Sequence, residues 1–252
     1  MANLDALFEQ SAQMTFGEQA AIEGVLARLR PRVSIELGTA SGGSLSRIAQ
    51  WSSEVHTFDF AHRVDETAFP NVTFHRGDSG TRLPEVLREL ETRGTVVDFV
   101  LVDGDHSPDG VQRDVEALLG STAVVETVIV LHDTANEGVR QGIRSGHPER
   151  HGKVVYADLS FVPTFDPESP VSEAWGGLGL IIVDAERSNW PERRAIKPNV
   201  AWSTTTRAAH AWRFVAPGRR LVRPVAYRVR KLVRERARRL EARRASAAGR
   251  GR

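Results

Sequence analysis

Carboxylates and imidazoles gather after two apolar runs of the chain. Asp103, Asp105 and His106 directly follow one run, and His132 and Asp133 directly follow another. Asp103 and Asp133 offer hard oxygen ligands that suit a divalent cation such as Mg²⁺, and His132 as a third ligand would also admit manganese, iron or zinc. Asp105 or His106 could then remove a proton from a hydroxyl group. The alternative, a set of helix-capping aspartates, is disfavoured by so many polar groups after two buried strands.

A glycine-rich turn, Glu36-Leu-Gly38-Thr-Ala-Ser41-Gly42-Gly43-Ser44, comes earlier in the chain. Its glycines let the backbone approach a ligand closely, and the helix that follows offers free N–H groups at its start. Such a turn can hold a pyrophosphate or the amino-acid end of a nucleoside cofactor. The spacing differs from the dinucleotide fingerprint G-x-G-x-x-G, because Gly38 and Gly42 are four residues apart.

Two further aspartates follow the next two strands. Asp59 is placed to accept hydrogen bonds from ribose hydroxyls, although it could instead cap a helix. Asp78, in the segment Gly77-Asp78-Ser79, could hold the edge of an adenine, and a simple N-cap role for the following helix is equally well supported. Together with the glycine turn, Asp59 indicates a nucleoside-binding site.

The elements that must position these residues alternate between strands and helices. Strands are expected at 33–37, 55–59, 72–75, 97–102, 127–131, 154–156 and 178–183. Helices are expected at 17–29, 44–51, 83–90, 110–119 and 137–143, with Pro84 in the first turn of its helix. This alternation predicts a parallel α/β sheet whose strand ends converge on one crevice. The proline- and aromatic-rich segment 158–177 is either a lid or an ordinary connection.

The charges of the chain are divided unevenly. Among the 252 residues there are 34 Lys and Arg and 32 Asp and Glu, a formal net charge of +2. Residues 207–252 hold 16 basic and two acidic residues (+14), which leaves 18 basic and 30 acidic residues (−12) in residues 1–206. We therefore expect a catalytic domain over 1–206 and a basic amphipathic, partly disordered helical tail over 207–252.

Composition excludes several classes of protein. The chain has no Cys, which rules out disulfide frameworks, Cys-based zinc sites and thiol catalysis. Its first residues carry no secretory signal, and no apolar run is long enough to span a bilayer. We expect a cytoplasmic protein, with the tail as a possible attachment to the inner membrane surface.

The residues together resemble class I S-adenosylmethionine-dependent methyltransferases. More narrowly, they are similar to the metal-dependent O-methyltransferases that include cephalosporin-hydroxylase-like proteins and macrolide or aminocoumarin sugar methyltransferases. The resemblance covers 17–183 and is carried by the glycine turn, Asp59, the segment Val102-Asp103-Gly104-Asp105-His106-Ser107 and the pair His132-Asp133.

The resemblance implies a Rossmann-like, seven-stranded sheet of order 3-2-1-4-5-7-6, with the last strand antiparallel and helices on both faces. It implies metal binding by Asp103 and Asp133, less securely by His132, and a general-base role for Asp105, for which His106 competes. The expected cofactor-binding residues are Glu36, Gly38, Ser41, Gly42, Ser44, Asp59 and Asp78. Unlike many relatives, this chain has a histidine in the pair His132-Asp133.

The function that follows is transfer of the methyl group of S-adenosylmethionine (SAM) to a hydroxyl of a sugar, glycoside or polar natural product, with a divalent cation, expected to be Mg²⁺. One alternative is an NAD-dependent oxidoreductase. Another is a vestigial methyltransferase that its tail targets to an anionic membrane or to nucleic acid. The small-molecule or glycan substrate is the expected partner, a homo-oligomer is conceivable, and nucleic acid is disfavoured because no recognition module is visible.

Overall fold

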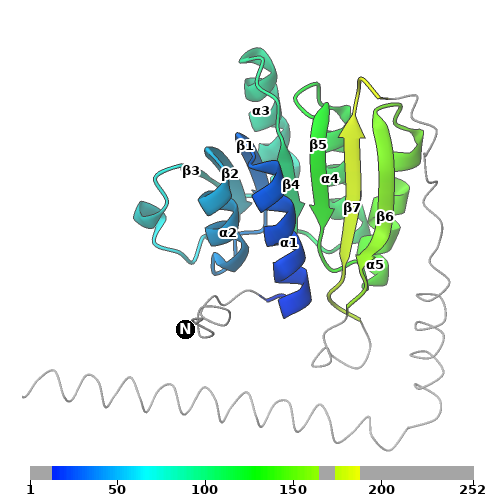
Figure 1. Ribbon diagram of the computed structural model, residues 1–252, viewed down its shortest axis with the longest axis horizontal. Helices are drawn as coiled ribbons and strands as arrows, with labels where there is room; N and C mark the ends of the chain where they lie inside the picture. Colours follow the sequence, from blue (N-terminus) through cyan, green and yellow to red (C-terminus); the bar gives the residue numbers. More distant parts are fainter. Residues whose placement is uncertain (1–12, 165–173, 188–252) are drawn as a thin grey trace, which may run out of the picture. The chain divides into compact units, whose positions relative to one another are not determined.

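A single seven-stranded sheet organises the residues that the computed structural model describes, 13–164 and 174–187. The strand order is β3-β2-β1-β4-β5-β7-β6, as the resemblance implied (Figure 1). The strands are β1 (Val33–Leu37), β2 (Glu54–Asp59), β3 (Val72–Arg76), β4 (Phe99–Val102), β5 (Glu126–Leu131), β6 (Val154–Val162) and β7 (Leu178–Asp184). The tail predicted over 207–252 lies outside the described residues, and so does part of the segment 158–177.

The central strands end level with one another, and this register brings the polar segments together. Strands β1 to β5 pair in parallel, whereas β7 runs antiparallel to both β5 and β6. Leu37 pairs with Val102, and Val102 pairs with Leu131. The residues that follow these three strands therefore emerge side by side at one edge of the sheet.

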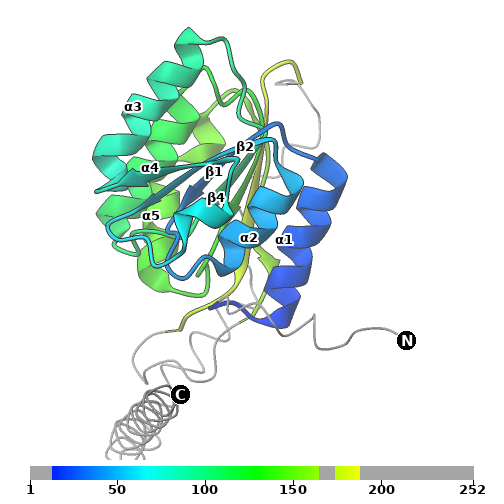
Figure 2. The ribbon, with the colours of Figure 1, turned by 90° about the vertical axis from the view of Figure 1, so that its left-hand side faces the viewer.

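Helices cover both faces of the sheet (Figure 2). The helices are α1 (Phe16–Leu29), α2 (Gly43–Trp51), α3 (Ser79–Thr92), α4 (Pro108–Gly120) and α5 (Glu137–Ser145), with short 3-10 turns at Glu66–Ala68 and Pro148–Arg150. Helices α1 and α2 pack on one face, and α3, α4 and α5 pack on the other. None of the helices in the described part of the chain is long and apolar enough to cross a membrane.

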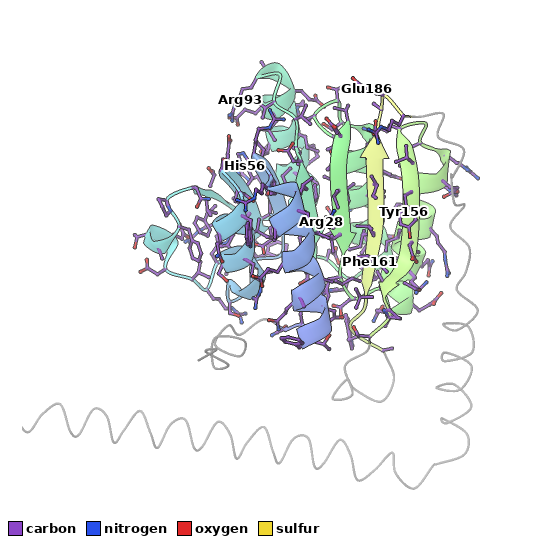
Figure 3. All side chains as sticks on the ribbon, viewed as in Figure 1. Arg28, His56, Arg93, Tyr156, Phe161 and Glu186 are labelled. Carbon is purple, nitrogen blue, oxygen red and sulfur yellow. The ribbon has the colours of Figure 1, made fainter. Side chains whose placement is uncertain are left out.

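Alternating side chains of the strands fill the two apolar layers. Ile35 of β1 faces the layer under α3, α4 and α5, and Phe99 of β4 faces the layer under α1 and α2. Tyr156 and Phe161 of β6 pack against the α1 side (Figure 3). The central strand β4, Phe99–Val102, is buried along its whole length and is the continuous apolar run expected of a parallel strand covered on both faces.

Two sequence expectations differ from the structure. Helix α3 begins at Ser79, four residues before the expected start, because the Asp78 side chain accepts a hydrogen bond from the Gly80 N–H at 3.3 Å and caps the helix. Pro84 therefore lies inside α3 and not in its first turn. Strand β6 extends to Val162, since antiparallel pairing with β7 continues past a register shift.

Candidate active site

A cavity of about 540 Å³ lies across the carboxyl ends of β1 to β5. Ten of the residues expected from sequence line it: Gly38, Ser41, Ser44, Asp59, Asp78, Asp103, Asp105, His106, His132 and Asp133. Glu36 and Gly42 do not. The glycine turn, Asp59 and Asp78 come from β1, β2 and β3, and the acidic and imidazole groups come from β4 and β5.

The glycine turn requires glycine at two positions. Gly38 has φ +93°, and a Cβ atom there would lie 2.1 Å from the backbone oxygen of Asp103. Gly42 has φ +80° and is the N-cap of α2, where a Cβ atom would lie 2.5 Å from the side chain of Val64. The turn can therefore pass close to β4 and open the N-terminus of α2 towards the cavity.

Glu36 lies beneath the turn and supports it. Its side chain is fully buried and accepts hydrogen bonds from Ser44 Oγ and Thr57 Oγ1, each at 2.6 Å. Burial raises the pKa of Glu36 to about 7, although these two hydrogen bonds favour the ionised form. Glu36 was expected to bind cofactor, and in the structure it does not line the cavity but connects to its wall through Ser44 and, by way of Thr57, through Thr39.

Asp59 fastens the glycine turn from the neighbouring strand. Its Oδ2 accepts hydrogen bonds from the backbone N–H groups of Thr39, at 3.1 Å, and Ala40, at 2.8 Å. Phe60, the next residue, also lines the cavity and is 76% exposed. An exposed aromatic ring beside a carboxylate at this place can stack on a nucleobase while the carboxylate accepts from a ribose.

Asp78 caps α3 and also lines the cavity, so the cap role is confirmed and the contact with an adenine stays a prediction. Ser79 lines the cavity next to it and donates to Asp114 Oδ1 at 3.1 Å. Asp114 is buried in α4, and burial raises its pKa to about 6. This end of the cavity is therefore polar and rich in hydrogen-bond acceptors.

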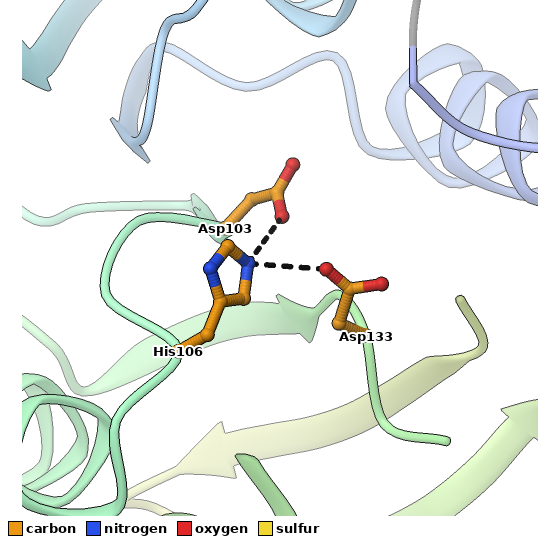
Figure 4. A group of neighbouring side chains, drawn as sticks. All are labelled: Asp103, His106 and Asp133. Carbon is orange, nitrogen blue, oxygen red and sulfur yellow. Dashed lines mark ion pairs between the residues drawn. The ribbon is translucent and has the colours of Figure 1, made fainter. Parts of the chain in front are cut away.

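At the other end of the cavity, His106 lies against two carboxylates (Figure 4). Its Nε2 is 3.0 Å from Asp133 Oδ2 and 3.6 Å from Asp103 Oδ1. The contacts with Asp103 and Asp133 raise the pKa of His106 to about 9, against the effect of burial. Trp175 packs edge-on against the imidazole, with ring centroids 5.1 Å apart. We refer to Asp103 and Asp133 as the carboxylate pair.

His132 contacts the same pair from the buried side. Its Nδ1 donates to Asp103 Oδ1 at 2.8 Å and lies 3.5 Å from Asp133 Oδ2. Its Nε2 lies 3.8 Å from Oε1 of Glu18, a buried residue of α1. Burial would lower the pKa of His132, but Asp103, Glu18 and Asp133 raise it well above its ordinary value.

The donor set fits a divalent cation. Asp103, Asp133 and His106 each offer one ligand atom, and these atoms all lie within 4.8 Å of one another. Two carboxylates with one imidazole suit manganese, iron or zinc as well as magnesium. The imidazole of this group is that of His106, which the sequence had indicated as a candidate base. A ligand role for His132 stays a prediction, since its Nδ1 already donates to Asp103.

Asp105, the expected general base, lines the cavity close to this group. Its Oδ1 accepts a hydrogen bond from the Ser107 N–H at 2.8 Å, and its Oδ2 is 3.7 Å from a guanidinium nitrogen of Arg113. Its side chain is 39% exposed, so it remains accessible to a substrate. In contrast, His106 directs Nε2 at the carboxylate pair.

Sequence reasoning missed two residues of this site. Glu18 belongs to a capping box with Thr15, and the pattern Thr15-x-x-Glu18 would have revealed that box but not the contact with His132. Phe60 follows Asp59 directly, so its position could have been noticed from the sequence.

Comparisons with known proteins agree with this geometry. Residues 35–134 match a family model described as a methyltransferase domain. They include the glycine turn, Asp59, Asp78 and the whole carboxylate and imidazole group. No curated protein matches the chain in sequence.

The chain is also similar to solved structures. A provisionally assigned O-methyltransferase from Klebsiella pneumoniae has a TM-score of 0.50 at 16% identity, over 72% of this chain and 86% of that one. An O-methyltransferase from Bacillus cereus in complex with SAH has a TM-score of 0.48 at 16% identity, over 71% and 86%. TomG from Streptomyces achromogenes, an O-methyltransferase involved in tomaymycin synthesis and solved with SAM, has a TM-score of 0.45 at 21% identity, over 68% and 81%.

Proposed function

We propose that this chain, whose residues 35–134 match a methyltransferase-domain model and whose sheet has the order β3-β2-β1-β4-β5-β7-β6, is a methyltransferase that transfers the methyl group of SAM to a hydroxyl of a polar acceptor such as a sugar or glycoside. One observation carries the proposal: a single cavity is lined by the glycine turn, Asp59 and Phe60 at one end and by the carboxylate and imidazole group at the other. A methyl donor and a hydroxyl acceptor need these two kinds of site next to each other.

The residues divide the work between the two ends. The glycine turn, Asp59 and Phe60 would bind the nucleoside and amino-acid parts of the cofactor. Asp103, Asp133 and His106 would hold a divalent cation at the other end. SAM supplies an activated methyl group, and the cation would supply positive charge that lowers the pKa of the acceptor hydroxyl.

Asp105 is the base that the geometry favours. Both Asp105 and His106 line the cavity, but the Nε2 atom of His106 faces the carboxylate pair. During transfer the new O–C bond forms, the C–S bond breaks with its electron pair going to sulfur, and the hydroxyl proton goes to the Asp105 carboxylate. An aliphatic hydroxyl is a weak acid, so a sugar acceptor needs this help more than a phenol does.

Calorimetric titration with S-adenosylhomocysteine (SAH) and with NAD tests the cofactor. We expect SAH to bind and NAD not to bind, and replacing Asp59 with asparagine should weaken SAH binding by about tenfold or more, since a hydrogen bond to a charged group is lost. Glu126→Gln, an exposed change at the far end of β5, is the matched control. Binding of NAD without SAH would support the oxidoreductase and overturn the proposal.

Transfer from labelled SAM to a panel of glycosides and phenols, with and without EDTA, tests the reaction. Asp103→Asn should keep SAH binding, lose Mn²⁺ binding measured by electron paramagnetic resonance, and lose transfer. Asp105→Asn should keep both binding steps and lose transfer by about 10²–10⁴-fold, the usual contribution of a general base. If EDTA and Asp103→Asn leave transfer unchanged, the metal part of the proposal is wrong.

A further inference from the structure

Glu18 is a buried carboxylate that the proposed mechanism does not use. It is 1% exposed, and its two oxygens face different parts of the structure. Oε2 accepts hydrogen bonds from the Thr15 N–H at 2.6 Å and the Thr15 hydroxyl at 2.8 Å, which completes the capping box of α1. Oε1 accepts hydrogen bonds from the Thr164 hydroxyl and the Gly177 N–H, and it faces His132.

Through His132, Glu18 connects to the carboxylate pair. The imidazole lies between Glu18 Oε1, which is 3.8 Å from Nε2, and Asp103 Oδ1, which is 2.8 Å from Nδ1. Only 4% of the His132 side chain is exposed. Glu18 therefore favours the ring orientation in which Nδ1 donates to Asp103, much as outer carboxylates orient histidines in metal sites.

Through Gly177, Glu18 also connects to the loop that carries Asp133. The Gly177 carbonyl accepts a hydrogen bond from the Thr134 N–H at 3.2 Å, and the Gly176 N–H donates to Asp133 Oδ1 at 2.5 Å. Asp133 has φ +55°, a left-handed conformation that a non-glycine residue keeps only when its surroundings hold it. The contact between Glu18 and Gly177 helps to keep Asp133 in this left-handed conformation.

Helix capping alone does not account for these contacts. A capping box works equally well at a solvent-exposed helix end, whereas burying a carboxylate is costly unless donors surround it. Here the donors to Oε1 are the Thr164 hydroxyl and the Gly177 N–H, and the His132 imidazole lies 3.8 Å away; these three residues belong to three other segments of the chain. The burial of Glu18 thus serves the carboxylate pair in addition to α1.

We propose that Glu18 is a positioning residue for the methyl transfer proposed above: by holding His132 and Gly177, it keeps Asp103 and Asp133 in the arrangement that binds the cation and the acceptor. It does not touch the cofactor or the acceptor in this role. Its effect reaches the reaction through the two residues that it holds.

Hydrogen exchange measured by mass spectrometry tests the holding role independently of activity. Glu18→Gln keeps the shape of the side chain but removes its charge and places an NH₂ group against N–H and O–H donors. We expect exchange over 131–136 and 174–179 to accelerate by about tenfold or more, as for loss of a charged hydrogen bond. Thr15→Ala, which disturbs only the capping side, should accelerate exchange only in the first turn of α1.

Kinetics then test whether the holding role matters for the reaction. Relative to wild type, Glu18→Gln should lower kcat by about 10–100-fold, the usual effect of losing an outer contact of a metal site. The KM for SAM should stay within about twofold, because Glu18 does not line the cavity and its side chain contacts none of the expected nucleoside-binding residues. Thr15→Ala should keep the wild-type kcat.

A double-mutant cycle shows whether Glu18 acts through His132. His132→Asn keeps a donor near the position of Nδ1 but cannot reach Glu18, so the loss in kcat of the double variant with Glu18→Gln should be smaller than the product of the two single losses, since only the contact with Gly177 remains to be lost; fully multiplicative losses would show that Glu18 does not act through His132. Should Glu18→Gln fail to fold, Thr164→Val removes one Oε1 contact and should give a weaker version of the same pattern.

The outcomes separate this inference from the proposed function. Exchange that accelerates only in α1, or a kcat of Glu18→Gln equal to that of Thr15→Ala, would overturn the positioning role while leaving methyl transfer intact. A wild-type protein that binds SAH but transfers no methyl group to any acceptor would contradict the proposed function, and the hydrogen exchange of Glu18→Gln would still show whether Glu18 holds the pair.

Discussion

Protonation of Glu36 should stabilise the folded protein, and replacing Glu36 with glutamine should remove this dependence on pH. Burial raises the pKa of Glu36 from 4.5 to about 7 in the folded state. Between pH 4.5 and pH 7 the folded state therefore binds more protons than the unfolded state, so stability falls as pH rises through this window. The difference corresponds to about 3 kcal/mol of unfolding free energy, present in full below pH 4.5 and lost above pH 7.

Urea unfolding followed by circular dichroism at pH 4.5, 5.5, 6.5 and 7.5 measures this term. Other groups also titrate, so the quantity to compare is the difference in unfolding free energy between wild type and Glu36→Gln at each pH. We expect that difference to shift in favour of the variant by about 3 kcal/mol from the lowest pH to the highest. Glutamine fits because the hydroxyls of Ser44 and Thr57, which now donate to Glu36, can rotate to accept from its amide.

A shift below about 0.5 kcal/mol, the usual accuracy of such comparisons, would refute the reasoning that burial keeps Glu36 protonated. The exposed variant Glu126→Gln should show no shift and serves as the control. A shift of opposite sign would mean that the hydrogen bonds to Glu36 outweigh its burial.

Three further predictions concern the turn, the loop and the cofactor. Gly38→Ala should destabilise the protein by about 3 kcal/mol or more in urea unfolding, because its Cβ would overlap a backbone oxygen, whereas Gly24→Ala in open space on α1 should stabilise it by about 0.5–1 kcal/mol. Arg140→Lys should cost about 2–4 kcal/mol in the same assay, since the buried guanidinium bonds two carbonyls and a hydroxyl, while Arg144→Lys in an exposed ion pair should cost under about 1 kcal/mol. Phe60→Ala should weaken SAH binding in calorimetry by about tenfold without lowering stability, and unchanged affinity would exclude stacking on this ring.

Much of the fold could be predicted from the sequence, because each strand and helix has its own local pattern of apolar and polar residues. Buried parallel strands require continuous apolar runs, and those runs predicted every strand of the sheet, with β6 too short. The order of the strands came from resemblance, since periodicity says nothing about which strands are neighbours. The start of α3 was missed because Pro84 favours the first turn of a helix and so indicated a start at Leu83, whereas Asp78 caps a helix that begins four residues earlier, at Ser79.

The types of residue at the site, and the edge of the sheet where they gather, followed from the sequence by itself. Asp103 and Asp133 had to be neighbours, since they follow adjacent strands whose ends are level. Which imidazole lies on which side of the pair depends on side-chain directions that spacing does not specify. Tertiary packing placed His106 on the cavity side and His132 on the buried side.

Glu18 lies far from the site in the chain, and only packing brings it there. Its capping box with Thr15 is local and readable, but its contacts with Thr164 and Gly177 join residues 146 and 159 positions apart. Such contacts arise because α1 packs on the sheet beside β6. No local sequence pattern predicts this long-range packing. The sequence thus determined the chemistry available at the site, and the tertiary structure decided which groups hold it in place.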